Sequence, residues 1–309
     1  MTELSVVIPV RNEEENLPEL VARLEATLRS MGLTHEIIFV TDVNQDDTLG
    51  VLRRLQAEHE CMKVIKLSGS FGQHVAVCCG LQFSRGRAAA IMDGDLQDLP
   101  EDLPILYDKM SEGFDVVYGV KDRKDDSALR NALSRAFIRT LDLVSDYPLE
   151  FNTSMFRLIS RRTVDELLKF QEREPSLTAL ISLIGFPSAG VPVRSGRRAR
   201  GKTNYSLARQ INFAVGFLVS FSTKPLRIMS AVGLLFAALS FLHLLVVVVQ
   251  SIVRGTPVMG WPTLVSLVTF FGGMQLIALG LIGEYVGRIF LQTKNRPRFF
   301  VEETIGDFS

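Results

Sequence analysis

The chain has 309 residues, of which 47% are hydrophobic, and its 34 basic and 34 acidic side chains give a formal net charge of zero at pH 7. This composition excludes a disordered chain, a collagen and a small disulfide-stabilised scaffold, and the length allows one large domain or two. A mean hydropathy of +0.21 is high for a chain with 22% charged residues. Apolar and charged residues are therefore expected in different parts of the sequence.

The first 174 residues alternate short apolar runs with amphipathic stretches. The expected strands are Ser5–Val10, Glu36–Thr41, Lys63–Leu67, Ala89–Asp93 and Asp115–Gly119. The expected helices are Glu14–Met31, Thr48–Glu58 and Pro100–Glu112. Strands and helices that alternate at this spacing predict an α/β domain with a mostly parallel sheet covered on both faces. In such sheets ligands bind beyond the carboxyl ends of the strands.

Polar residues follow three of these strands. The turn Pro9-Val-Arg-Asn-Glu13 opens a helix whose free N–H groups could face an anion or a base. Asp42 follows the second strand, and Asp93-Gly-Asp-Leu-Gln-Asp98 follows the fourth. Most isolated Asp-x-Asp sequences are solvated loop acids. Placed after a buried strand, however, two such carboxylates can share a hard divalent cation, which can bridge the phosphates of a nucleotide.

The second part of the chain differs in charge and hydropathy. Up to Glu174 there are 21 basic and 30 acidic residues, a net of −9, whereas the remainder holds 13 and 4, a net of +9. Ile228–Val253 is a run of 26 residues without a charge, and a second uncharged run ends at Gly283. A helix of the first run exceeds the hydrocarbon thickness of roughly 30 Å. Two transmembrane helices are therefore favoured over two buried core helices of a soluble protein.

The orientation of this hairpin follows from its flanking basic residues. Lys224 and Arg227 precede the hairpin and several basic residues follow it, while Arg254 alone lies in the link. We therefore expect both chain ends in the cytoplasm. The stretch Ser206–Ser222 places apolar residues on one stripe, which predicts an amphipathic helix at the cytoplasmic interface.

An ordered set of motifs resembles glycosyltransferase family 2. The motifs are Val6-Val-Ile-Pro-Val-Arg-Asn-Glu-Glu-Glu-Asn-Leu17, Asp42, Phe71-Gly-Gln-His74 and Asp93-Gly-Asp-Leu-Gln-Asp98. More narrowly, the chain resembles the polyprenyl-phosphate glycosyltransferases, which include dolichol-phosphate mannose synthase and the undecaprenyl-phosphate 4-deoxy-4-formamido-arabinose transferases. Three segments of the second part match as well: Phe221–Arg227, Gly280–Arg288 and Arg296–Val301. The resemblance covers essentially the whole chain.

The resemblance implies a nucleotide-sugar-binding domain of the A type and an inverting, metal-dependent transfer to a polyprenyl (undecaprenyl) phosphate, with UDP as the default nucleotide. By position in the motifs, the nucleotide-sugar-binding residues are Pro9, Asn12, Glu13, Asp42, Asp93 and Arg198. The implied ligands of Mg²⁺ or Mn²⁺ are Asp93, Asp95 and Gln97. The implied contacts to the acceptor phosphate are Lys121, Arg130 and Arg135, and the implied catalytic residues are Asp95, Arg130 and Arg157.

Five positions depart from the family pattern. Arg11 stands where Tyr is usual, Thr41 replaces an Asp, and Gly69-Ser70 replaces Arg-Asn. Met155 stands where many relatives have an Asp that could serve as a base. The acceptor is a phosphate that is already anionic near neutral pH, so no proton has to be removed. Positioning and charge stabilisation of the leaving diphosphate can carry such a reaction.

The expected organisation has four parts. They are a cytoplasmic catalytic domain over 1–200, a basic loop with the interfacial helix over 201–227, a transmembrane hairpin over 228–285 and a cytoplasmic tail over 286–309. Together with this organisation, the resemblance implies an enzyme of the cytoplasmic membrane that modifies lipids or cell-surface glycans. Its expected partners are the nucleotide sugar, the polyprenyl phosphate, membrane lipids and a second copy of the chain, and no nucleic acid is expected.

Two alternatives stay open. The departures at Met155 and Thr41 would also fit a degenerate relative that binds nucleotide or lipid without transfer, against which the Asp93–Gln97 motif argues. A processive polysaccharide synthase shares the catalytic domain. It requires further membrane helices and a Gln-x-x-Arg-Trp motif, whereas the single tryptophan here, Trp261, lies in the link.

Overall fold

The computed structural model describes residues 2–121, 153–172, 176–196, 224–254, 260–294 and 296–308. These residues belong to two compact units. The first unit contains the sheet and, from the far end of the chain, residues 295–309. The second unit contains the two longest helices. The expected interfacial helix and the predicted site residues Arg130, Arg135 and Arg198 lie outside the described residues.

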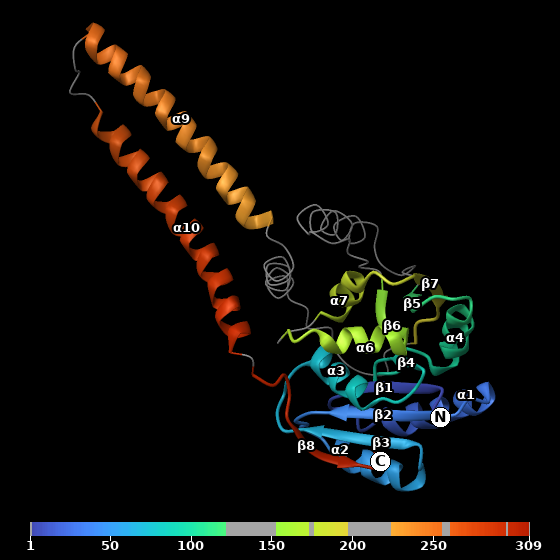
Figure 1. Ribbon diagram of the computed structural model, residues 1–309. Helices are drawn as coiled ribbons and strands as arrows, with labels where there is room; N and C mark the ends of the chain where they lie inside the picture. The colour runs from blue at the N-terminus through green and yellow to red at the C-terminus, as the bar shows by residue number, and fades with distance from the viewer. Residues whose placement is uncertain are drawn as a thin grey trace. The chain divides into compact units, whose positions relative to one another are not determined.

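The first unit is built on an eight-stranded sheet of order β7-β5-β6-β4-β1-β2-β3-β8 (Figure 1). Its strands are β1 Leu4–Val10, β2 His35–Thr41, β3 Met62–Leu67, β4 Ala88–Ile91, β5 Val116–Lys121, β6 Thr153–Ser160, β7 Ser188–Val193 and β8 Val301–Ile305. The central strands β4, β1, β2 and β3 are parallel, as are β5 and β7. Strand β6 runs antiparallel between β4 and β5, and β8 runs antiparallel along β3. The prediction of a mostly parallel sheet is confirmed.

Helices follow the parallel strands and cover both faces of the sheet (Figure 1). They are α1 Leu17–Met31, α2 Thr48–Glu58, α3 Gln73–Phe83, α4 Leu103–Ser111 after the short 3₁₀ helix η1 Pro100–Asp102, α6 Arg161–Lys169 and α7 Leu177–Ile184. Alternate residues of strand β1 point to opposite faces of the sheet, and both faces are buried. Val6 and Ile8 belong to the same core as the buried leucines of α1. Val7 lies under α3, where a Cβ on Gly80 would come within 2.4 Å of it.

The expected strands and helices agree with the structure to within a few residues, with one functional difference. The strand expected over Ala89–Asp93 ends at Ile91, so Asp93 lies in the loop beyond it. The chain turns there, with Leu96 in the left-handed region at φ 62°. A Cβ on Gly94 would lie 2.6 Å from a methyl group of Val10, so only glycine fits this close approach.

The second unit consists of α9 Lys224–Arg254 and α10 Trp261–Thr293. The helices meet through the ring of Phe236, whose centroid lies 5.6 Å from that of Phe270 and 6.1 Å from that of Phe271. By length and composition, one segment among the described residues, Phe270–Thr293, is long and apolar enough to cross a membrane. Helix α10 continues to Thr293, beyond residue 285 where the sequence analysis ends the hairpin.

Candidate active site

The loop after β4 holds three carboxylates in a defined arrangement. The backbone N–H of Asp93 donates to Oδ2 of Asp98 at 2.9 Å. The backbone N–H of Gln97 donates to Oδ1 of Asp95 at 3.1 Å. The loop is therefore fixed by its own side chains at the carboxyl end of β4, as the sequence predicted for Asp93 and Asp95.

Asp93 lies in an environment with an excess of negative charge. Burial, with the neighbouring Asp98 and Asp95, raises its pKa from 3.8 to about 7, while Lys121 and Arg157 act in the opposite direction. A partly buried carboxylate beside two others is stabilised by a cation, and oxygen ligands of this kind suit Mg²⁺ or Mn²⁺. These residues therefore fit a divalent metal.

The described residues would supply few of the ligands of such a metal. Over the described part of the chain there is no group of three or more His, Cys, Asp or Glu placed to hold a metal ion. Mg²⁺ in nucleotide sites usually takes one or two carboxylates, with phosphates and water in the other positions. Asp93 and Asp95 would supply the carboxylates. Gln97 contributes its backbone N–H to Asp95, and metal binding by its side chain stays a prediction.

Lys121 pairs with the same loop. Its Nζ lies 2.7 Å from Oδ1 of Asp98, whose side chain is fully buried. The sequence analysis assigned Lys121 to the acceptor phosphate, and that contact stays a prediction. In the structure the positive charge of Lys121 offsets the negative charge of Asp98, and this ion pair links the end of β5 to the loop after β4.

Arg157 lies in the interior, with 1% of its surface exposed. Its Nε donates to the carbonyl oxygen of Met155 at 3.2 Å and its Nη2 to Oγ1 of Thr178 at 3.2 Å. Its guanidinium lies 5.4 Å from the ring centre of Tyr118. The resemblance implied that Arg157 is a catalytic residue, and that role stays a prediction. In the structure it is a buried positive charge that acts on Asp93 from within the domain.

The turn after β1 is held by the loop after β2. The N–H of Asn12, which has φ 56°, donates to Oδ1 of Asn44 at 3.0 Å, and its own Oδ1 accepts from the N–H of Gln45 at 2.7 Å. The N–H of Glu13 donates to Oγ1 of Thr48 at 2.9 Å. The N–H groups of Asn12 and Glu13 are therefore engaged within the protein, and binding of an anion or a base by the free N–H groups of the helix that follows stays a prediction.

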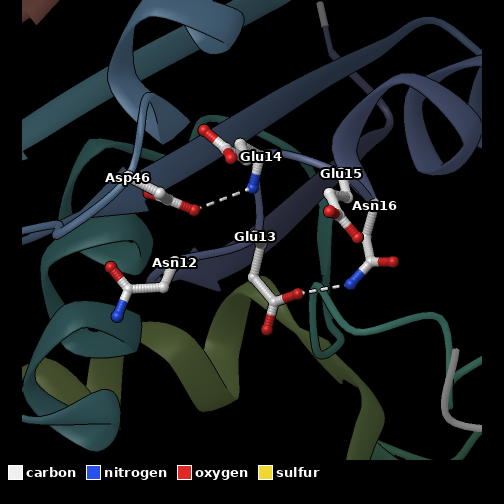
Figure 2. Close-up of a pocket in the computed structure, with 6 residues that line it drawn as sticks. All are labelled: Asn12, Glu13, Glu14, Glu15, Asn16 and Asp46. Carbon is white, nitrogen blue, oxygen red and sulfur yellow. Dashed lines mark hydrogen bonds between the residues drawn. The ribbon is translucent and has the colours of Figure 1, made fainter. Parts of the chain in front are cut away.

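A polar hollow of about 260 Å³ opens at this turn. Figure 2 shows its lining, in which the N–H of Glu14 donates to Asp46 and the amide of Asn16 donates to Glu13. Four of the six lining side chains are acidic: Glu13, Glu14, Glu15 and Asp46. Such a lining offers acceptors for hydroxyl and N–H groups, as the ribose and base of a donor have.

Asp42 lies at the end of β2 and contacts two residues that depart from the family pattern. Oγ of Ser70 donates to its Oδ2 at 2.7 Å, and Nη1 of Arg11 donates to Oγ of Ser70 at 3.1 Å. Thr41, which also departs from the family pattern, is fully buried, and its Oγ1 accepts a hydrogen bond from the side-chain amide of Asn44 at 2.8 Å. Thr41 thus supports the loop that holds the turn after β1.

Sequence reasoning did not assign Ser70 and Gln73 to the site. Nε2 of Gln73 donates to Oδ1 of Asp93 at 2.5 Å. The loop after β3 thus contacts Asp42 through Ser70 and Asp93 through Gln73. The Phe71–His74 motif was the signal, but a motif does not reveal which carboxylates its side chains contact.

Comparison with known proteins defines the class of the chain. The profile of glycosyl transferase family 2 matches residues 5–168, and that of the GtrB C-terminal hairpin matches residues 224–289. The chain belongs to glycosyltransferase family 2 and is a glycosyltransferase.

Relatives of similar length carry more specific names. The chain is 34% identical over 305 residues to an undecaprenyl-phosphate 4-deoxy-4-formamido-L-arabinose transferase of Pseudomonas paraeruginosa, covering 98% of this chain and 90% of the relative. It is 32% identical over 302 residues to a prophage-derived bactoprenol glucosyl transferase of Shigella flexneri, covering 97% and 98%. Among solved structures, mannosyl-3-phosphoglycerate synthase from Rubrobacter xylanophilus shares the fold, with a TM-score of 0.50, 16% identity and coverage of 71% and 73%.

Proposed function

We propose that the protein transfers a sugar from a nucleoside-diphosphate donor to a polyprenyl phosphate such as undecaprenyl phosphate. The observation that carries this proposal is the position of Asp93 and Asp95 in the loop beyond β4. The loop after β3 links this position to the end of β2, because Gln73 donates to Asp93 and Ser70 donates to Asp42. The full-length relatives named for undecaprenyl phosphate and bactoprenol support the choice of acceptor.

In this proposal each end of the donor has its own residues. Pro9, Asn12, Glu13 and Asp42 bind the base and ribose. Asp93 and Asp95, with Gln97, hold Mg²⁺ or Mn²⁺, which supplies positive charge to the diphosphate leaving group. Arg157 and Lys121 balance the charge of the loop from the protein side. Arg198 would contact the diphosphate.

The acceptor phosphate would approach from the opposite side of the sugar, which gives inversion. Arg130 and Arg135, with Lys121, would orient it, because charge-assisted contacts to phosphate are strong. The side chain at position 155 is a thioether that cannot accept a proton. The nucleophile is therefore the phosphate oxygen in its anionic form, and catalysis consists of positioning and charge stabilisation.

We further propose that α9 and α10 form a membrane hairpin, with the catalytic unit and both termini in the cytoplasm. The match of residues 224–289 to the GtrB C-terminal hairpin supports the hairpin, and the basic residues in the first turn of α9 and after α10 support its orientation. Residues 206–222 would lie at the membrane interface as an amphipathic helix. The glycines of α10 would allow close contact with a second copy of the chain.

The test is a transfer assay with the purified full-length protein, undecaprenyl phosphate, Mg²⁺ or Mn²⁺ and a panel of nucleotide sugars, read out as lipid-linked sugar. We expect Asp95→Asn to reduce product by at least about 100-fold, because a neutral amide is a poor ligand for a hard cation. Asp108→Asn changes an exposed carboxylate on α4 and serves as the matched control.

Three results would contradict parts of the proposal. Activity near that of the wild type in Asp95→Asn, or in excess EDTA, would overturn the metal site. Donor binding with no lipid-linked product from any donor would favour a non-catalytic binding protein. A polymer in place of a single lipid-linked sugar would favour a processive synthase.

A further inference from the structure

The loop between β3 and α3 contacts two carboxylates of the site. Ser70 donates to Oδ2 of Asp42 at 2.7 Å, and Gln73, the first residue of α3, donates to Oδ1 of Asp93 at 2.5 Å. The loop also contains Gly72, in the left-handed region at φ 89°. Glycine has more conformational freedom than any other residue. Contacts from outside the loop are therefore needed to keep its two donors in place.

Such contacts come from the segment 296–300, which follows α10 in the chain and belongs to the first unit. The backbone N–H of Ser68 donates to the carbonyl oxygen of Phe300 at 2.9 Å. The ring centroid of Phe300 lies 6.4 Å from that of Phe71, with the planes tilted by 51°. This separation lies within the range of stabilising aromatic pairs. One residue of the tail thus holds the loop through both its backbone and its side chain.

The pairing of β8 with β3 is irregular just before this contact. Lys66 pairs with Glu303, whereas the next residue, Leu67, pairs with Val301, so the register shifts between them. A β-bulge bends a strand and changes the direction of the side chains that follow it, and bulges are frequent next to active sites. The shift therefore lies where the tail passes from the edge of β3 to the loop.

A second contact from the same segment reaches helix α3. Burial raises the pKa of the Cys78 thiol to about 11, and a hydrogen bond from Arg298 together with its charge opposes this rise. Burial also raises the pKa of Glu172, again against the charge of Arg298. Arg298 thus contacts the helix that begins with Gln73, and Phe300 contacts the loop before that helix.

We propose that Phe300 and Arg298 are positioning residues of the active site. They hold the loop after β3 and the start of α3 in the arrangement that brings two donors to Asp42 and Asp93. This inference rests on the proposed function, because it takes these two carboxylates as part of the donor and metal site.

The test measures hydrogen–deuterium exchange by mass spectrometry on the full-length protein in detergent. The side chain of Phe300 buries little surface, since the residue is 56% exposed, so Phe300→Ala should keep the melting temperature of the wild type. We expect it to raise the exchange rate over residues 68–76 by about two- to tenfold, the effect of losing one aromatic pair on a local opening equilibrium. Phe300→Tyr keeps the ring and should restore the rate of the wild type.

Phe308→Ala is the matched control. Phe308 also packs its ring from the tail onto the first unit, with its centroid 5.5 Å from that of Phe83 at the far end of α3. Its loss should leave exchange over residues 68–76 unchanged. Arg298→Ala should raise exchange in the first turns of α3, whereas Arg296→Ala, which changes an exposed arginine of the same segment, should not.

Two further measurements separate positioning from a general loss of structure. Phe71→Ala and the double variant with Phe300→Ala should each give the same increase in exchange as Phe300→Ala alone, because each removes the same pair. In the transfer assay, Phe300→Ala should raise the KM for the active sugar nucleotide by about two- to tenfold. The KM for undecaprenyl phosphate should stay unchanged, because the loop contacts carboxylates assigned to the donor side.

The outcomes distinguish this inference from the proposed function. Unchanged exchange over residues 68–76 in Phe300→Ala, or an equal increase in Phe308→Ala, would overturn the inference even if lipid-linked product forms. A specific increase in exchange with both KM values unchanged would also overturn it. A specific increase in a protein that makes no lipid-linked product from any donor would support the positioning of the loop and overturn the transfer.

Discussion

His74 is a titratable residue beside the site, and the proposed mechanism does not require it to be protonated. Burial, together with the positive charge of Arg157, lowers its pKa from 6.5 to about 4. Its Nδ1 is buried and makes no hydrogen bond to the described residues. The imidazole is therefore neutral at physiological pH, and His74 is not a source of positive charge for either phosphate.

This pKa predicts a pH dependence of stability. Between about pH 6.5 and pH 4 the unfolded chain binds a proton at His74 and the folded chain does not, so this contribution is complete above pH 6.5 and is lost as the pH falls. Melting curves of the wild type and His74→Gln at pH 7.5 and 5.5 test it. Between pH 7.5 and pH 5.5 the free energy of unfolding of the wild type should fall by about 1 kcal/mol more than that of the variant. Equal losses would show that His74 is solvated.

Met155 allows a test of whether a protein base is missing. Its carbonyl oxygen accepts from Arg157, and this backbone contact survives a change of side chain. Met155→Ala should cost little beyond packing, and Met155→Asp should be tolerated without a large gain in kcat, because the phosphate nucleophile is already anionic. A gain of orders of magnitude in single-turnover rates would identify a lost base as the limiting defect.

The sequence predicted the individual site residues better than their partners. Asp93, Asp95 and Asp42 lie at strand ends, where the alternation of strands and helices placed them. The environment of Arg157 was not predictable, because its burial depends on strands and helices distant in the sequence. Ser70 and Gln73 were missed because hydrogen bonds between side chains of different loops leave no local pattern.

At the level of elements, the parallel core was predictable and the antiparallel and edge strands were not. Strands β1 and β2 contain the buried apolar runs Val6–Ile8 and Ile37–Val40, because both faces of the sheet are covered there. Strand β7 contains Gly190 and Pro192, which lower strand propensity and are tolerated at the edge of the sheet. Strand β8 has the sequence Val-Glu-Glu-Thr-Ile, whose charges suit an exposed edge.

Strand β8 should matter for stability through its backbone rather than its ion pairs. Glu303 pairs with Arg53 at 2.7 Å, but both side chains are well exposed. Glu303→Ala should therefore change the free energy of unfolding by less than about 1 kcal/mol. Ending the chain before Val301 instead exposes the β3 edge and should cause a lower melting temperature and aggregation, visible in size-exclusion profiles. A truncated chain that stays monodisperse and equally stable would contradict this role.

At the level of the whole molecule, the segregation of charge predicts the topology of the membrane hairpin. With both termini in the cytoplasm, a cysteine at position 256 should react with an impermeant thiol reagent added to intact cells, and a cysteine at position 309 should react only after lysis. The natural cysteines, of which Cys78 and Cys79 are buried, are first replaced by alanine or serine in the control. The reverse labelling pattern would place the nucleotide site outside the cytoplasm and overturn the proposed donor.

The antiparallel pairing of β8 with β3 makes the catalytic unit discontinuous in the sequence. Figure 1 shows β8, coloured red, beside β3, coloured blue. The N–H of Ser68, at the start of the loop that holds Asp42 and Asp93, donates to the carbonyl oxygen of Phe300 at 2.9 Å. A ribosome adds about 5–20 residues per second, so a nascent chain waits on the order of tens of seconds between making β3 and making its neighbour. During that interval α9 and α10 are synthesised, so in the proposed topology the hairpin is available for insertion into the membrane before the sheet can be completed.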